Sequence, residues 1–110
     1  MSSAQIAAFE KMLAAGKDSA LLRVGLGNAH LAAGDASRAA EHLQQAVRQD
    51  PGYSAAWKLL GRALAEARRP EEALDAYQQG IAAAQRKGDK QAMKEMQVFA
   101  RRLAKQLGEA

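Results

Sequence analysis

The chain has 110 residues, of which 48% are hydrophobic and 25% are charged, and it contains no cysteine. This length supports a buried core without cross-links, and the missing cysteines exclude a disulfide framework, a thiolate nucleophile and a cysteine-based zinc site. The net charge of +4 arises in residues 86–107, where seven basic side chains accompany two acidic ones, so the basic character belongs to one segment and not to the whole chain.

Helices are expected throughout, because alanine, leucine and glutamine are abundant and no alternating β-branched run predicts a strand. Apolar residues three and four apart predict the first helix over 3–15. The second helix follows Asp18 or Ser19, either of which can cap it, and stops at the turn Gly34-Asp35. Its inward residues are expected to be Leu22, Leu26, Ala29 and His30.

The third helix should continue to about Gln49, where Asp50-Pro51-Gly52 ends it, since proline cannot continue a helix. We expect Ser54 to cap the fourth helix. Pro70 suits the first position of the fifth helix, which should run to Lys87. The inward residues of these helices are expected to be Ala39, Leu43, Ala46, Val47, Trp57, Leu60, Gly61, Leu64, Ala73, Leu74, Tyr77, Gly80 and Ile81.

A sixth helix is expected after Asp89, with Met93, Met96, Ala100, Leu103 and Leu107 on its inner side. The two methionines and Phe99 are interpreted as a seam against the fifth helix, and an adaptable binding surface is the alternative. Because every connection is short, neighbouring helices should be antiparallel. The predicted fold is an all-α stack of helix-turn-helix units with about six helices.

The sequence also repeats itself with a period of 34 residues. The identical pairs are Leu26/Leu60, Gly27/Gly61, Ala29/Ala63, Ala33/Ala67, Ala39/Ala73, Gln44/Gln78 and Gln45/Gln79. A fixed period of this length indicates stacked supersecondary units, each of which buries its apolar face on its neighbours. Such stacks usually work through an extended surface and not through a catalytic pocket.

The second unit reads Trp57-Lys-Leu-Leu-Gly-Arg-Ala-Leu64, followed by Ala73-x-x-x-Tyr77 and Gly80. This pattern resembles the tetratricopeptide repeat. The resemblance implies repeats at 20–53 and 54–87, a half-repeat helix at 3–15 and a capping helix at 89–107, all within one domain. The first unit departs from the pattern, with Arg23 in the place of Trp57 and His30 in an aromatic position; the second has Arg68-Arg69 where the first has Gly-Asp.

In the resembled family the first helix of each pair lines a groove that binds peptides or helices of partner proteins. Projecting the helical period onto this chain predicts a shallow groove formed by the second, fourth and sixth helices. Its lining residues are Leu21, Val24, Asn28, Lys58, Leu59, Arg62 and Glu66. Lys58, Arg62 and Asn28 have the chemistry to hold an acidic or C-terminal peptide, as some members of that family do. The alternative is a solvated face on which Arg62 pairs with Glu66.

The resemblance therefore implies a non-enzymatic protein–protein interaction module without a cofactor. One alternative is a self-associating module that dimerises through its end helices. Another is a binder of nucleic acid or of an anionic surface through the basic residues of the last helix, namely Lys90, Lys94, Arg101 and Lys105. The last alternative is weaker, because no aromatic residues are interleaved to stack bases.

Neither a metal site nor a catalytic site is expected. His30 should point inward and His42 toward solvent, with no acidic residue at a metal-ligand spacing. Ser19, Ser37 and Ser54 stand at expected helix starts, where capping accounts for them. The opening residues lack a secretory signal pattern, and no stretch approaches the about 18 apolar residues of a membrane span. We therefore expect a soluble cytoplasmic protein.

Overall fold

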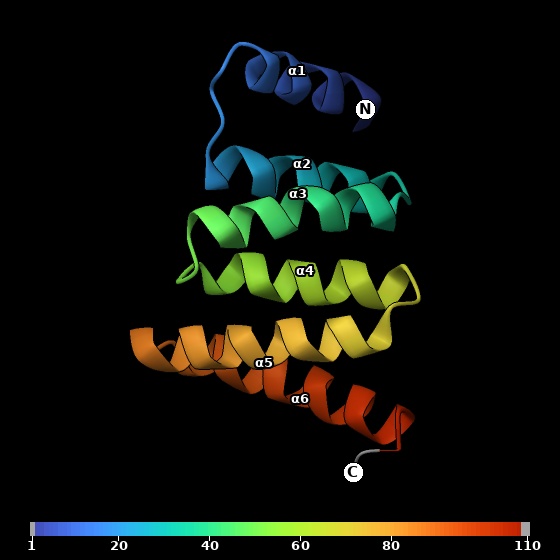
Figure 1. Ribbon diagram of the computed structural model, residues 1–110, viewed down its shortest axis with the longest axis vertical. Coiled ribbons are helices and arrows are strands. Elements are labelled where there is room, and N and C mark those ends of the chain that lie inside the picture. Colours follow the sequence, from blue (N-terminus) through green and yellow to red (C-terminus); the bar gives the residue numbers. More distant parts are fainter. Residues whose placement is uncertain (1, 109–110) are drawn as a thin grey trace.

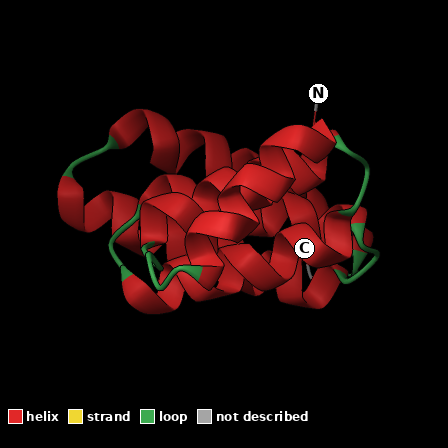
Figure 2. Cartoon of the chain, turned by 90° about the horizontal axis from the view of Figure 1, so that it is seen from above, coloured by secondary structure: helices red, strands yellow, loops and turns green. Residues whose placement is uncertain are grey.

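The computed structural model describes residues 2–108, which form six helices and no strand. The helices are α1 (Ser2–Ala14), α2 (Ala20–Ala32), α3 (Ala36–Gln49), α4 (Ser54–Glu66), α5 (Pro70–Lys87) and α6 (Lys90–Gln106). They stack in chain order along the long axis of the molecule, with the two termini at opposite ends (Figure 1). The connections gather at the two ends of the helices (Figure 2). The expected all-α antiparallel stack is confirmed.

Side chains at the helix starts show which capping predictions were right. Ser19 accepts the backbone N–H of Leu22, and Asp89 accepts that of Ala92, both at 3.1 Å, as expected. The prediction for Ser54 was wrong: α4 begins at Ser54 itself, after Tyr53. The carbonyl of Tyr53 already accepts two N–H groups of the first turn, so the helix starts one residue too early for a serine cap. Ser37 likewise lies inside α3, which Asp35 caps.

Glycines set the distance between the helices of each pair. A Cβ atom added to Gly27 would lie 2.5 Å from Leu43, and one added to Gly61 would lie 2.6 Å from the ring of Tyr77. These contacts join α2 to α3 and α4 to α5. The backbones therefore approach closely because large residues on one helix sit directly over a glycine on the other.

The helix α6 follows a different spacing from α2 and α4. The first residues of α2 and α4 are 34 positions apart, whereas α6 begins 36 positions after α4. Met96 consequently takes the place in α6 that Leu26 and Leu60 take in α2 and α4, and all three are fully buried. Met96 packs against Gly80 of α5, which confirms the seam expected between these two helices.

The two ends of the stack differ in chemistry. At the N-terminal end, α1 packs on α2 alone, and no side chain between Ser3 and Ala14 is buried. At the C-terminal end, α6 buries Met96 and Leu103 and exposes a row of basic residues. These exposed basic residues are Lys90, Lys94, Arg101 and Lys105. None of the helices described is long and apolar enough to cross a membrane.

Candidate functional site

The predicted groove residues fall into two separate hollows. The first, here called the α4–α6 hollow, has a volume of about 470 Å³. Three of the residues predicted to line the groove are found in it, together with two aromatic residues from α5 and α6. Its lining residues are Lys58, Leu59, Arg62, Tyr77 and Phe99.

The second hollow, here called the α1–α2 hollow, has a volume of about 390 Å³. It contains the remaining predicted residues of α2, together with residues of α1 and of the connection between them. Its lining residues are Phe9, Met12, Lys17, Ser19, Leu21, Leu22, Val24, Gly25 and Asn28. Glu66 lines neither hollow, so the seven predicted residues do not form one continuous site.

Both cations of the α4–α6 hollow are engaged by acidic side chains. The Nζ atom of Lys58 donates to Oε1 of Glu95 at 2.6 Å, which links α4 to α6. This bond lowers the pKa of Glu95. The Nε atom of Arg62 donates to Oε2 of Glu66 at 2.8 Å, as the alternative interpretation expected. An acidic ligand would therefore meet cations that each already hold one carboxylate.

The apolar wall of this hollow comes from Tyr77 and Phe99, whose rings stack with their centroids 5.4 Å apart. Burial raises the pKa of Tyr77 to about 12, so its phenol stays neutral at physiological pH. Neither aromatic residue was predicted to line the groove. Phe99 is the tenth residue of α6, the position that the buried Ala29 and Ala63 hold in α2 and α4, so helical projection does not mark it as a groove residue.

The prediction for His42 was wrong, because its ring is half-buried and stacks on that of His30. The ring centroids are 5.3 Å apart and the planes differ by 9°. Nη1 of Arg23 donates to Nδ1 of His42 at 3.1 Å, and Arg23 also forms two hydrogen bonds of 2.9 Å to Asp18. Burial and the neighbouring Arg23 lower the pKa of His42. Arg23, in the place of Trp57, thus organises a polar cluster between α2 and α3.

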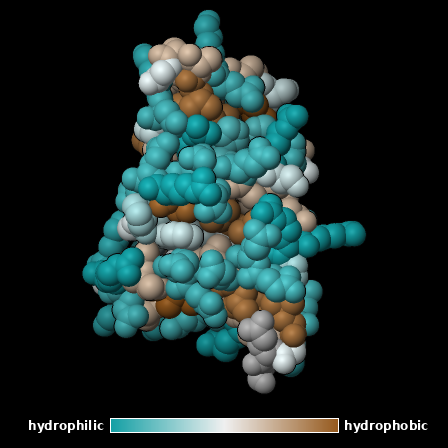
Figure 3. Space-filling view, in the orientation of Figure 1, coloured by the Kyte–Doolittle hydropathy of each residue, from teal (hydrophilic) through white to brown (hydrophobic). Residues whose placement is uncertain are grey.

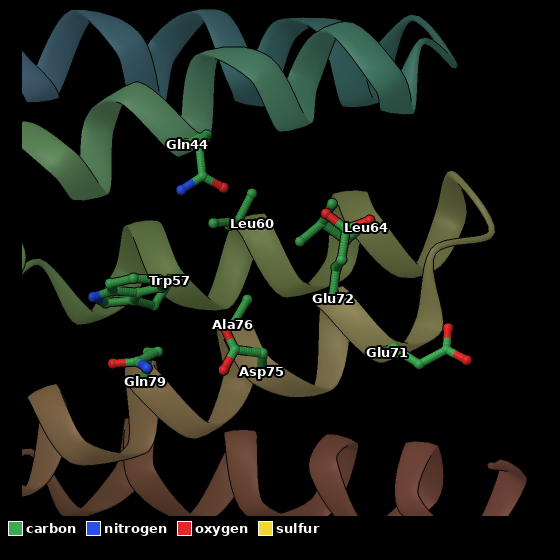
Figure 4. Close-up of a pocket in the computed structure, with 9 residues that line it drawn as sticks. All are labelled: Gln44, Trp57, Leu60, Leu64, Glu71, Glu72, Asp75, Ala76 and Gln79. Carbon is green, nitrogen blue, oxygen red and sulfur yellow. The ribbon is translucent and has the colours of Figure 1, made fainter.

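A third hollow, of about 400 Å³, is lined by residues of α3, α4 and α5 (Figure 4). Trp57, Leu60 and Leu64 of α4 line it together with acidic and amide side chains of α3 and α5. The residues from those two helices are Gln44, Glu71, Glu72, Asp75, Ala76 and Gln79. Glu72 is held by two hydrogen bonds from Arg69, at 2.8 and 2.7 Å. None of its lining residues was predicted to line a binding site.

None of these sites has the composition of a metal centre. Among residues 2–108, no three histidine, aspartate or glutamate side chains lie close enough to hold a metal ion. What the hollows share is a lining that combines apolar and polar side chains.

Comparisons with known proteins agree with this organisation. The family model described as tetratricopeptide repeat matches residues 4–54 and 24–89. A TPR repeat-containing protein of Pseudomonas aeruginosa is 60% identical over 98 residues, which cover 89% of this chain and 93% of that protein. The solution structure of a protein from Bordetella parapertussis superposes with a TM-score of 0.77 at 44% identity, covering 92% of this chain and 88% of the other. For a tetratricopeptide repeat domain protein from Salinibacter ruber the TM-score is 0.75 at 27% identity, and the coverage is 84% and 93%.

Proposed function

Since the chain belongs to the tetratricopeptide repeat family, we propose that it is a non-enzymatic interaction module which binds a peptide or helix of a partner protein in the α4–α6 hollow. The observation that carries this proposal is the composition of the hollow, in which an apolar wall of Leu59, Tyr77 and Phe99 lies beside two cations. The cations are Lys58 and Arg62.

This composition supports a ligand with two features. A space of about 470 Å³ accommodates one large apolar side chain, and the two aromatic rings give it a flat surface to pack on. The cations at the rim favour an acidic side chain or a terminal carboxylate next to that anchor. The best ligand is therefore an apolar anchor residue flanked by negative charge.

The ion pairs at the rim are compatible with such binding. The Arg62–Glu66 pair is exposed and the Lys58–Glu95 pair is partly exposed, and an exposed pair contributes only ~0.2–1 kcal/mol. A ligand carboxylate can thus take the place of Glu95 on Lys58, or of Glu66 on Arg62, at small cost. The exchange also limits the gain in affinity, so we expect binding in the micromolar range, at roughly 1–100 µM.

Selection from a library of random peptides displayed on phage tests this proposal. Selected peptides should combine an apolar anchor with an acidic residue, and Leu59→Asp should weaken their binding by about 10-fold or more, measured by fluorescence anisotropy. Lys58→Glu together with Arg62→Glu should weaken the binding of acidic peptides in the same way. Arg101→Glu changes one of the exposed basic residues of α6. It is the matched control and should leave binding unchanged. Equal binding by native chain and Leu59→Asp would contradict the proposal, as would turnover of a substrate by the purified chain.

A further inference from the structure

The third hollow differs from the α4–α6 hollow in the charge of its lining. The helix α4 lies between α3 and α5 and packs on both, and all three helices line the hollow (Figure 4). Its charged lining residues are the carboxylates Glu71, Glu72 and Asp75, and its other lining residues are apolar or carry amides. The charged lining residues of the α4–α6 hollow are two cations. The two hollows therefore suit ligands of opposite charge.

The indole of Trp57 is the apolar surface that this hollow offers to a ligand. Trp57 is half-buried, whereas Leu60 and Leu64 beside it are buried. Its Nε1 atom donates to the carbonyl of Pro51 at 2.7 Å, which fixes the orientation of the ring. In the space-filling view, apolar surface shows at mid-height among polar side chains (Figure 3). A fixed indole that reaches solvent is the aromatic surface that cations prefer.

The polar side chains of α5 follow one face of that helix. Glu72, Asp75 and Gln79 are three and four positions apart, so they project from the same side. Glu71 and Glu72 lie in the first turn, where carboxylates are favoured by the helix dipole. Asp75 lies one turn further on, where that effect has faded. Within residues 2–108 the ion pairs include neither Glu71 nor Asp75, so both carboxylates are available to a ligand.

The negative charge of this hollow is local. Glu72 is paired with Arg69, so the three lining carboxylates and this one guanidinium give a charge of −2. The whole chain, in contrast, carries a net charge of +4. A basic ligand is therefore attracted to the hollow but repelled by the molecule as a whole. Attraction that is confined to one place favours specific binding over general adhesion of basic chains.

We propose that the third hollow binds an arginine-containing segment of a partner protein. One guanidinium would lie over the ring of Trp57 and donate to the carboxylate of Asp75, since both residues line the same hollow of about 400 Å³. Glu71 would hold a second basic residue of the segment. Arginine suits the hollow better than lysine, because its planar group both stacks on a ring and forks onto a carboxylate. This site is separate from the α4–α6 hollow, so the proposal does not depend on the proposed function.

Fluorescence titration tests the proposal directly, because Trp57 is the only tryptophan of the chain. The probe is a peptide of about 12 residues in which arginine alternates with alanine, and two comparison peptides carry lysine or glutamate in place of arginine. The arginine peptide should change the emission of Trp57 until it saturates. The lysine peptide should bind about 3-fold or more weakly, and the glutamate peptide should leave the emission unchanged. Absence of any change with the arginine peptide up to about 1 mM would overturn the proposal. Equal binding of the lysine peptide would overturn the assignment of arginine.

Two variants separate binding in the hollow from a general effect of charge. Asp75→Lys should weaken the arginine peptide by about 10-fold or more. Glu10→Lys, on α1, is the matched control: it changes the net charge equally and should leave binding nearly unchanged. Both side chains are exposed, so the circular dichroism of both variants should match that of the native chain. Leu59→Asp, in the α4–α6 hollow, should also bind the arginine peptide normally. Native affinity in Asp75→Lys would overturn the proposal, as would an equal loss in Glu10→Lys.

Discussion

The cost of backbone strain can be measured at Arg68, because it is the one non-glycine residue with positive φ in residues 2–108. Its φ is 63°, and Gly34 at the equivalent turn of the first repeat has a φ of 81°. Hydrogen bonds close both turns in the same way: the N–H of Arg69 donates to Leu64 at 2.9 Å and that of Asp35 to His30 at 2.8 Å. The two turns thus have one geometry and two different residues.

Arg68→Gly should stabilise the protein. The left-handed conformation costs a residue with a Cβ atom about 1–2 kcal/mol, and the replacement removes this cost. Glycine adds freedom to the unfolded chain, which offsets about 0.4–1 kcal/mol. The net gain lies between about 0 and 1.6 kcal/mol, with a central value of about 0.8 kcal/mol. For a chain of this size it should raise the melting temperature by roughly 2–5 °C.

The reverse change at the first turn should have the opposite sign. No atom lies within 4 Å of a Cβ atom added to Gly34, so Gly34→Ala changes only the backbone preference. It should lower the free energy of unfolding by about 0.5–1 kcal/mol. Arg68→Ala is the control: it removes the guanidinium but keeps the Cβ, and should change stability by less than ~0.5 kcal/mol. Urea unfolding followed by circular dichroism measures all three. If Arg68→Ala stabilises as much as Arg68→Gly, side-chain charge and not backbone strain is the cause, and the reasoning is refuted.

Three further predictions concern the packing, the polar cluster and the hollow. Gly61→Ala should destabilise by about 1–3 kcal/mol, because its methyl group would lie 2.6 Å from a buried tyrosine ring; equal melting temperatures would argue against close packing at this crossing. The pKa of His42 is lowered in the folded state, so folding stability should be full above about pH 6.5 and decline as the pH falls below it. His42→Gln should flatten that decline in melts between about pH 7.5 and 5. Lys58→Glu should weaken binding of acidic peptides, because Lys58 itself contacts the ligand. Adding Glu95→Lys restores the ion pair with its charges exchanged and should not restore binding. Recovery of binding would show that the ion pair, and not Lys58 alone, is needed.

The sequence predicted the stack because its signals are local and repeated. Proline at position 70, aspartate at 89 and glycine at 88 fix helix boundaries through backbone chemistry alone. The recurrence of Gly27 as Gly61 identified the crossing points, since only glycine admits Leu43 or Tyr77 at that distance. Such features do not depend on distant parts of the chain.

The candidate site was predicted less completely, because it depends on relations between helices. Phe99 lines the hollow from the helix position that the buried Ala29 and Ala63 hold in α2 and α4, and the repeat pattern does not reveal this. His42 was misplaced because its partner Arg23 lies 19 positions away in the sequence. The link from Lys58 to Glu95 spans 37 positions and follows from no helical spacing. Side-chain pairs across helices require the packing to be known first.

The basic row on α6 has a consequence for how far copies of this chain can join. Open-ended fibres grow only when both ends of a subunit are adhesive, since each addition must create a new attachment point. Attachment of another copy to the outer face of α6 would bring four lysine and arginine side chains out of water together. We therefore expect this row to oppose linear polymerisation through α6.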